Sequence, residues 1–468
     1  YTYDAFGNLT YIDYPDSRSK TISRYWALNS GIDHAYYAEE TTGPSAPDAI
    51  TVFDAAGRAL HSRVESLSNE VAVDKFYNAK GQLVLQTKPY FYNNGGPVGY
   101  IRTNYDIYGR VSNIRDSVYA DLAITSFSYN GLSTTVTDPA GRSKTTTLNL
   151  IGQTASVEDA AGEIRYNYNS MGLLKSSIID EVTVTDNTYD EYGRKTAYFE
   201  INTGTTSFEY NNFSELVSQT DANDNVYNMT YDNAGRLTDK SGPEGDYTYS
   251  YFSAGNGIGK IGIVELSNGM SQKFTYNTFG QITSRQEHID GNDYIFEYEY
   301  DGYGNQIFMT YPNGFEIEQL YNTDGLLVEI QREDNDEPIW RLVSLDPMGR
   351  PYEIEQGDDV LHTLYDYDYH GYLTSISSEA QDEEYEWDYL TGNLLSRSDN
   401  IYQLVETFDY DEDFDRLVKI SATNLPDKEI SYVPNGNIYT KYDAGTYIYG
   451  SEKLNAVTEI ADEGLCSD

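Results

Sequence analysis

Two short acidic runs carry oxygen ligands at alternate positions, as the start of a calcium-binding EF-hand loop does. They are Asp221-Ala222-Asn223-Asp224-Asn225 and Asp411-Glu412-Asp413-Phe414-Asp415. Both lack the glycine that such a loop needs at its sixth position, where Val226 and Arg416 stand. Asp and Asn side chains also accept backbone N–H bonds in turns. The sequence favours turns at both places, with a bound cation as the alternative.

The other residues that could do chemistry form no recognisable constellation. The histidines are dispersed, and none belongs to a His-Glu-x-x-His or comparable metal pair; they are His34, His61, His288, His362 and His370. The glycine-rich run 255–260 resembles a phosphate loop, but Ala254 occupies the first glycine position and Ile261 replaces Ser or Thr. We interpret it as a hairpin loop. The sequence predicts no catalytic, cofactor-binding or metal-binding residues, and a protein that is not an enzyme.

The elements that would position any site come from one repeated pattern: an aromatic residue, Asp or Asn, two variable residues and Gly. Clear copies begin at Tyr3, Tyr105, Tyr189, Tyr231 and Tyr300, and degenerate copies begin at Tyr168, Tyr276 and Tyr321. The glycine positions recur about every 21 residues, with a half-period of 10 or 11. Ser214 and Asp415 keep the spacing but lose the glycine. A fixed period of this kind indicates a repeat architecture.

Local chemistry predicts that each repeat consists of two strands and two turns. Segments such as 205–210 and 294–300 alternate apolar or aromatic with polar residues, which is typical of half-buried strands. The Asp or Asn of the motif can accept N–H groups across a turn, and Gly can supply a positive φ. Leu or Val two residues after Gly begins the next buried face. The predicted fold class is all-β, an array of antiparallel hairpins.

Tyrosine dominates the aromatic residues, with 47 Tyr against 16 Phe and 3 Trp. A buried tyrosine ring contributes a large apolar area, yet its hydroxyl still needs a hydrogen-bond partner. A sheet that buries the tyrosine rings and exposes their hydroxyls to solvent would provide both the apolar packing and the hydrogen-bond partners. Packing within the repeat is therefore the preferred role, and stacking on sugars by an exposed subset is the alternative.

The repeat resembles the YD repeats of the Rhs family, which also occur in wall-associated proteins, Tc-toxin C-subunits and teneurins. The tract Tyr432-Val433-Pro434-Asn435-Gly436-Asn437-Ile438, followed by Gly445-Thr446-Tyr447-Ile448-Tyr449-Gly450, is especially similar to the bacterial Rhs core. The resemblance covers residues 1–468. It implies a long β-sheet that spirals into a hollow cocoon, which in the toxins encloses a C-terminal toxic domain.

Bacterial members of the family usually end in an autoproteolytic segment with an Asp-Pro-x-Gly type motif. Asp138-Pro139-Ala140-Gly141 and Asp346-Pro347-Met348-Gly349 look similar, but both follow the repeat spacing and have further repeats beyond them. We interpret both as ordinary turns. The expected organisation is one continuous array over residues 1–468, a fragment of a larger protein, with less regular loops near 24–50 and 240–270.

The composition is strongly acidic, with 31 Lys and Arg against 75 Asp and Glu and a net charge of −44. This balance argues against nucleic-acid binding and against attraction to anionic lipids. Salt screens such self-repulsion, so we expect a saline habitat and a melting temperature that rises with added salt. No segment is long and apolar enough for a transmembrane helix. The one cysteine, Cys466, excludes an intrachain disulfide.

These features favour a non-enzymatic β-shell segment of a secreted bacterial Rhs-type toxin. The partner would be the protein's own C-terminal effector, which lies outside this chain, and cell-surface glycans or other secretion and delivery components are further candidate partners. The alternative is an extracellular adhesin or fibre protein whose array contacts glycans, cell surfaces or further copies of itself. The expected location is secreted or cell surface, and no cofactor is expected.

Overall fold

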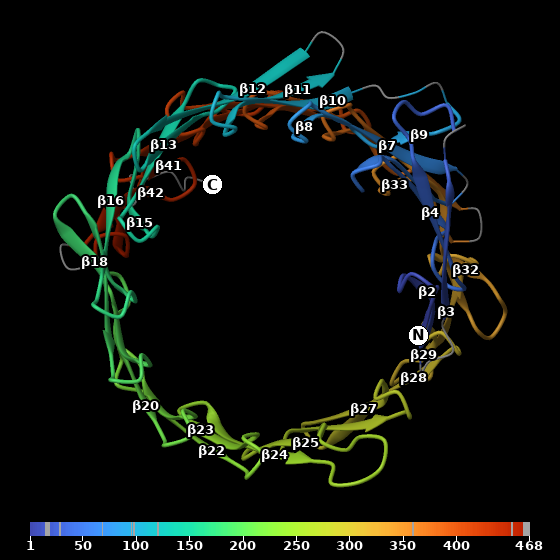
Figure 1. Cartoon of the computed structure of the whole chain (residues 1–468). Coiled ribbons are helices and arrows are strands. Elements are labelled where there is room, and N and C mark those ends of the chain that lie inside the picture. Colours follow the sequence, from blue (N-terminus) through green and yellow to red (C-terminus); the bar gives the residue numbers. More distant parts are fainter. Residues whose placement is uncertain are drawn as a thin grey trace. The chain divides into compact units, whose positions relative to one another are not determined.

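The computed structural model describes residues 1–14, 19–27, 30–67, 69–94, 96, 99–118, 121–357, 360–450 and 453–461. In these ranges it contains 43 strands, assigned to a single antiparallel sheet (Figure 1). The predicted all-β class and the antiparallel array are therefore confirmed.

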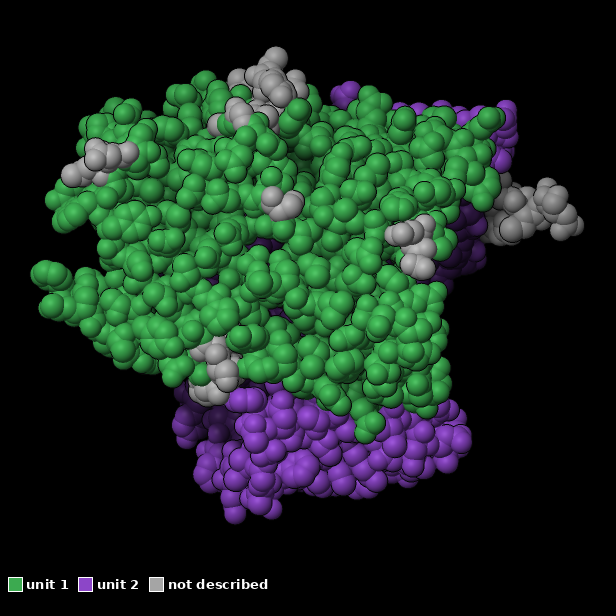
Figure 2. Space-filling model, turned by 90° about the vertical axis from the view of Figure 1, so that its right-hand side faces the viewer, with its two compact units in different colours: residues 1–126, 296–405 green, residues 127–295, 406–468 purple. Residues whose placement is uncertain are grey.

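The chain divides into two compact units, which Figure 2 shows in different colours. Unit 1 comprises Tyr1–Ser126 and Phe296–Val405, and unit 2 comprises Phe127–Ile295 and Glu406–Asp468. Each unit thus combines an earlier and a later stretch of the sequence. Strands β12, β28 and β38 contain the points at which the chain passes from one unit to the other.

The strands of the earlier stretches run from residue 2 to residue 289. They are β1 Thr2–Tyr3, β2 Leu9–Asp13, β3 Ser19–Trp26, β4 Tyr37–Thr42, β5 Ala49–Phe53, β6 Ala59–Glu65, β7 Glu70–Tyr77, β8 Leu83–Thr87, β9 Tyr90–Phe91, β10 Gly99–Tyr105, β11 Val111–Val118, β12 Asp121–Asn130, β13 Ser133–Thr137, β14 Ser143–Leu148, β15 Thr154–Asp159, β16 Gly162–Tyr168, β17 Leu174–Ile179, β18 Val182–Tyr189, β19 Lys195–Glu200, β20 Gly204–Tyr210, β21 Leu216–Thr220, β22 Val226–Tyr231, β23 Leu237–Gly242, β24 Gly245–Tyr251, β25 Ile261–Leu266, β26 Ser271–Tyr276 and β27 Ile282–Ile289.

The strands of the later stretches begin with β28, which starts at the end of unit 2's earlier stretch. They are β28 Asn292–Tyr300, β29 Gln306–Thr310, β30 Glu316–Tyr321, β31 Leu327–Arg332, β32 Pro338–Leu345, β33 Pro351–Gln356, β34 Leu361–Tyr367, β35 Leu373–Ser377, β36 Asp382–Trp387, β37 Leu394–Asp399, β38 Leu404–Tyr410, β39 Leu417–Ala422, β40 Lys428–Tyr432, β41 Ile438–Lys441, β42 Gly445–Tyr449 and β43 Val457–Ala461. The expected looser stretches contain β3 to β5 and β24 to β25. The described residues 30–36 and 252–260 in these stretches lie outside the named strands.

Because each strand pairs antiparallel with its sequence neighbour, successive turns emerge at alternate edges of the sheet. We call the edge with turns 149–153, 169–173, 190–194 and 211–215 the motif edge. The opposite edge carries turns such as 160–161, 180–181 and 201–203. Two glycine-motif turns at half-period positions, 138–142 and 221–225, also lie at the opposite edge. β9 departs from the meander by pairing with β7 beside β8.

The motif turns are closed as the sequence predicts. In the turn 190–194, the N–H of Gly193 donates to the carbonyl of Asp190 over 3.1 Å, and Gly193 has φ +80°. Oδ1 of Asp190 accepts the N–H groups of Tyr192 at 3.0 Å and Arg194 at 2.9 Å. The pairing register shifts between Thr188 and Tyr189, which marks a β-bulge beside the turn. One carboxylate therefore satisfies two backbone N–H groups of the turn.

Many motif tyrosines do not present their hydroxyls to water as the sequence suggested. They donate to a backbone carbonyl at the start of the strand after the preceding motif turn, as Tyr189 does to Leu174, Tyr210 to Lys195 and Tyr231 to Leu216, at 2.8 to 2.9 Å. The indole N–H of Trp387 makes the same bond to Leu373 at 2.7 Å. We call these bonds the tyrosine ladder. The expectation failed because the repeat itself supplies an acceptor.

The sheet leaves much more of its surface exposed to solvent than a compact protein of this size would. The chain exposes 27752 Å², whereas two compact bodies of half its mass would together expose about 21,000 Å². Strands such as β20 and β24 alternate half-buried aromatic residues with exposed Thr, Ser or Glu. Among the described residues, the buried hydrophobic side chains all belong to unit 1: Ile22, Ala27, Ala38, Val52, Ala72, Tyr90, Ile317, Leu342 and Ile354.

Candidate functional site at the unit 1 junction

Within unit 1, the opposite edge of the earlier stretch meets the motif edge of the later stretch. The N–H of Ser45 donates to the carbonyl of Thr323 at 3.1 Å, and the Asn305 side chain donates to the Ser45 hydroxyl at 3.0 Å. Further along, Nζ of Lys88 donates to the carbonyl of Tyr369 at 3.1 Å. We call residues 43–48 and 66–96, together with residues 301–325 and 346–372, the unit 1 junction.

Lys88 is a buried charged residue of this junction. It follows β8, its side chain is largely buried, and Nζ lies 2.9 Å from Oδ1 of Asp116 on β11. A buried ammonium is tolerated only when it is paired and hydrogen-bonded. Asp116 supplies the countercharge and Tyr369 the carbonyl, so Lys88 ties the earlier stretch to a motif turn of the later one.

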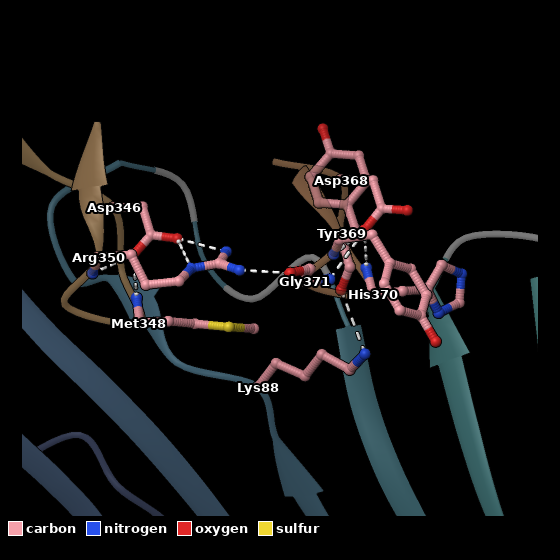
Figure 3. A network of polar contacts seen from close by, with 9 residues as sticks. Lys88, Asp346, Met348, Arg350, Asp368, Tyr369, His370 and Gly371 are labelled. Carbon is pink, nitrogen blue, oxygen red and sulfur yellow. Dashed lines mark hydrogen bonds and ion pairs between the residues drawn. The ribbon is translucent and has the colours of Figure 1, made fainter. Parts of the chain in front are cut away.

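The motif turn that receives this contact is bonded to the motif turn before it (Figure 3). In the earlier of the two turns, Oδ1 of Asp346 accepts the N–H groups of Met348 at 2.9 Å and Arg350 at 2.8 Å. The Arg350 guanidinium bonds Oδ2 of Asp346 and also donates to the carbonyl of Gly371 in the second turn. One arginine therefore holds two turns together at a fixed spacing.

A cavity of about 490 Å³ lies at the junction, between the segment after β8 and these turns. Its wall is mainly apolar and aromatic, and includes Pro89, Tyr90, Phe91, Pro347, Met348, Tyr352, Tyr367 and Tyr369. Such a wall can pack against apolar or planar groups. The arrangement supplies contact surface and structural hydrogen bonds.

A buried polar network lies directly behind the cavity. Nδ1 of His61 is 2.7 Å from Oδ1 of Asp74, and the Tyr90 hydroxyl donates to Oδ2 of Asp74 at 2.7 Å. The backbone N–H of Asp74 donates to the Thr87 hydroxyl at 2.9 Å. Burial, and then the hydrogen bond to Asp74, raises the pKa of Tyr90. These bonds fix the strand segment that carries Lys88, which gives the network a positioning role.

Unit 2 has a smaller junction with the same pairing of edges. Arg142, at the opposite edge, forms an ion pair with Asp415 in the motif turn 411–416. The N–H of Asn455 donates to the side-chain oxygen of Asn202 at 2.8 Å. Both units therefore join an earlier opposite edge to a later motif edge.

The first aspartate of each acidic run accepts hydrogen bonds within a turn. Oδ1 of Asp221 accepts the N–H groups of Asn223 at 2.8 Å and Asn225 at 2.9 Å. Asp411 accepts the N–H of Phe414 at 2.7 Å and the Arg416 guanidinium at 2.6 Å. Among the described residues, no group of three or more His, Cys, Asp or Glu side chains has a metal-binding arrangement. The Asp138 and Asp346 segments form motif turns as well.

The histidines remain dispersed in space. His61 is buried against Asp74, His288 lies 2.7 Å from Asp293, His362 lies 3.6 Å from Glu355, and His370 stacks on Tyr389. His34 occupies a loop with φ +66°. The run 255–260 forms a loop whose Gly259 N–H donates to Phe252. Cys466 lies outside the described residues.

Sequence analysis missed the arginine that follows the motif glycine. Arg194 bonds Asp190 of its own turn at 2.7 Å, donates to the carbonyl of Asn211 in the next turn at 2.9 Å, and lies 4.9 Å from the Tyr210 ring centroid. The signal was present, because arginine stands at the equivalent position in Arg58, Arg110, Arg142, Arg236, Arg350 and Arg416. Gln82 and Gln153 replace it and also bond the next turn.

Comparison with solved structures identifies the fold. The chain superposes on the TcdB2–TccC3–Cdc42 crystal structure with a TM-score of 0.72 and 15% identity over 91% of its length. It also matches TcdB2–TccC3 with a TM-score of 0.67, 15% identity and 96% coverage. The chain has the fold of the Tc toxin β-shell. The predicted resemblance to the YD-repeat proteins is thus confirmed at the level of fold.

The Tc holotoxin pore of Photorhabdus luminescens is a further match, with a TM-score of 0.66, 14% identity and 96% of this chain covered. This chain spans 26% to 30% of the length of the three Tc toxin chains it matches here. No protein-family model and no curated protein sequence matches it. Within the described residues, no helix has the length and hydropathy needed to cross a membrane.

Proposed function

We propose that this chain is a non-enzymatic shell segment of a secreted bacterial toxin of the Rhs type. Its sheet encloses an effector segment that follows the repeats in the same protein, and it releases that segment at a target cell. The observation that carries this proposal is the fold match to TcdB2–TccC3 over at least 91% of the chain.

The local structure suits a wall. In motif turns such as 190–194, an Asp or Asn side chain accepts two backbone N–H groups, and the tyrosine ladder bonds one repeat to the next. Arginines such as Arg194 and Arg350 bond consecutive turns. Because these hydrogen bonds satisfy backbone groups at the turns and join neighbouring repeats, the sheet can resist fraying without a large hydrophobic core. Such a wall can separate an enclosed segment from proteases.

The test is protease protection of the downstream segment. The complete protein would be produced from its full reading frame and treated with a broad-specificity protease, followed by mass spectrometry of the surviving peptides. We expect peptides from the downstream segment to survive at least tenfold longer than in the same protein whose shell has been unfolded beforehand.

A matched control separates enclosure from intrinsic stability. The downstream segment would also be produced alone and digested under the same conditions. Rapid digestion alone and slow digestion within the complete protein support enclosure. Equal digestion rates in both forms, or a reading frame that encodes nothing after the repeats, would overturn the proposal.

A further inference from the structure

The cavity of the unit 1 junction has several aromatic rings in its wall. Tyr352 and Tyr369 line it and are 40% and 47% exposed, so part of each side chain stays accessible. Tyr90 also lines it, and the Tyr90 hydroxyl is already bonded to Asp74 at 2.7 Å. The volume of about 490 Å³ falls within the range of small-ligand pockets, which is about 300–1,000 Å³. The cavity can therefore hold a small molecule or one long side chain against ring faces.

The two cationic side chains of the wall are each paired with a carboxylate. Arg350 pairs with Asp346, and Lys88 pairs with Asp116 at 2.9 Å (Figure 3 shows the first pair). Cζ of Arg350 also lies 3.7 Å from the centroid of the Tyr367 ring, which lines the same cavity. A cation over a ring face is attracted by the negative charge of its π electrons. The wall thus contains one example of the contact that a cationic ligand would make.

Two further carboxylates of the wall have no countercharge of this kind. Asp366 and Asp368 line the cavity, and neither forms an ion pair with another residue in the described part of the chain. Asp368 accepts N–H groups of its own turn, and Asp366 accepts the Ser375 hydroxyl at 3.3 Å. The charge of Asp366 raises the pKa of Tyr352, so this carboxylate acts close to one of the rings. The wall as a whole is therefore aromatic and negatively charged.

These properties favour a ligand that is both cationic and apolar. A neutral apolar group would contact the rings but bring no countercharge to Asp366 and Asp368, and an anion would be repelled by them. An alkylammonium ion suits both parts of the wall, because its alkyl carbons pack on the rings while its charge attracts the π electrons and the carboxylates. We propose that the junction cavity binds an alkylammonium group. This assignment does not rest on the enclosure of an effector.

The first experiment titrates choline against the whole chain by ligand-detected NMR. It is done at about 0.15 M salt, because the chain carries −44 and screening limits unspecific attraction of cations. The comparison ligand is 3,3-dimethylbutan-1-ol, which has the shape of choline but carbon in place of the charged nitrogen. A ligand pair of this kind separates the contribution of the charge from that of the apolar shape.

Four variants locate the site. Tyr352→Leu and Asp366→Asn each change one part of the cavity wall. The matched controls are Tyr439→Leu on β41 and Glu209→Gln on β20, which change an exposed tyrosine and an exposed carboxylate on strands of unit 2. Each control removes the same kind of side chain as one wall variant, and circular dichroism checks that all four are folded.

We expect saturable binding of choline by the wild type and at least tenfold weaker binding of the neutral alcohol. Each wall variant should weaken choline binding at least fivefold, and each control should leave it unchanged. The absence of saturable binding, equal affinities for the two ligands, or controls that weaken binding as much as the wall variants would each overturn the proposal.

The second experiment identifies the source of the alkylammonium group. This chain spans 26% to 30% of the chains it matches, so the group could belong to a small molecule or to a lysine in a further part of the same protein. The complete protein, produced from its full reading frame, would be titrated with choline in the same way. Retained binding assigns the cavity to a small molecule.

Loss of choline binding in the complete protein assigns the cavity to a lysine of the further chain. A carbodiimide, which joins a carboxylate to an amine in direct contact with it, should then link Asp366 or Asp368 to that lysine, as read by mass spectrometry of the peptides. A complete protein that neither binds choline nor forms this link would overturn the proposal, because an uncharged segment would then fill the cavity.

Discussion

Units 1 and 2 are built from the same repeat but are stabilised differently. Unit 1 contains the buried hydrophobic residues of the described chain, together with the Lys88 contact and the His61–Asp74–Tyr90 network. Unit 2 has buried Ser176, Ser177 and Asn187 instead, and relies on the tyrosine ladder and the motif turns. The comparison teaches that this repeat can hold a sheet together by hydrogen bonds between repeats, with packing added where loops cover the sheet.

The largest predicted difference comes from removing a core side chain of unit 1. Leu342→Ala on β32, where Leu342 is 7% exposed, should reduce the free energy of unfolding by about 2–5 kcal/mol. Ile263→Ala, at a partly buried position of β25 in unit 2, should reduce the free energy of unfolding by clearly less. Urea unfolding followed by hydrogen exchange in each unit measures both. An equal loss at the two sites would break the comparison.

Acid should affect the turns on which unit 2 depends. The side-chain hydrogen bond from Arg236 lowers the pKa of Asp232, and the one from Asn225 lowers the pKa of Asp221. A carboxyl whose pKa is lower in the folded state stabilises the fold above its unfolded value, near 3.9, and loses that contribution as pH falls through the folded value. Unit 2 should therefore lose stability below about pH 4, and it should open before unit 1 because unit 1 keeps its buried hydrophobic contacts.

The contribution of one turn can be isolated by substitution. Asp232→Asn removes a proton-binding difference between the folded and unfolded states, so the loss of stability between pH 5 and pH 3 should be shallower than in the wild type. Glu209→Gln, which changes an exposed strand carboxylate in the same unit, is the control. Urea unfolding at several pH values measures both slopes. An unchanged slope for Asp232→Asn would contradict the assigned role.

Removing one bond of the tyrosine ladder should have a moderate effect. Tyr231→Phe keeps the ring but leaves the carbonyl of Leu216 without its donor, and should cost about 1 kcal/mol. Tyr321→Phe in unit 1 removes the equivalent bond to Gln306. Hydrogen exchange should show wider loss of protection around Tyr231 than around Tyr321, because packing in unit 1 limits the opening. The reverse pattern would show that the ladder is not the main support of unit 2.

The smallest changes in stability are expected when glycine is introduced at the two motif positions that lack it. The two changes should have opposite signs. Ser214 and Asp415 have φ +65° and +54°. Ser214→Gly relieves this strain at the cost of a weak bond from Arg194, and should stabilise by up to about 1 kcal/mol. Asp415→Gly also removes the ion pair with Arg142 and should destabilise. Thermal melts of both variants test the sign, and stabilisation by Asp415→Gly would contradict it.

Much of the fold was predictable because its determinants are local. The Asp or Asn of the motif, the glycine with positive φ and the alternation of strand residues act within a few positions of each other, so turns and strands could be placed from the spacing alone. The prediction for the motif tyrosines was wrong about the partners of their hydroxyl groups. Their hydroxyl acceptors lie 14 or 15 residues away for most of them, a distance at which the repeat must already be folded.

The candidate site could not be predicted in the same way. Lys88 and Tyr369 are 281 residues apart, and Asn202 and Asn455 are 253 apart. Nothing in the sequence near Lys88 indicates its partner, since the contact depends on which strands of the two stretches come side by side. The arginine after the motif glycine was missed for a different reason, because its recurrence was visible but its bond to the next turn was not.

The sequence by itself determined the repeat, the turn chemistry and the antiparallel array, because these follow from short-range sterics and hydrogen bonding. Only the tertiary structure decided which motif turns are covered and which are exposed. Tyr192 and Tyr303 occupy the same motif position, yet one is 75% and the other 39% exposed. The physical reason is that burial at an edge depends on a distant stretch of chain.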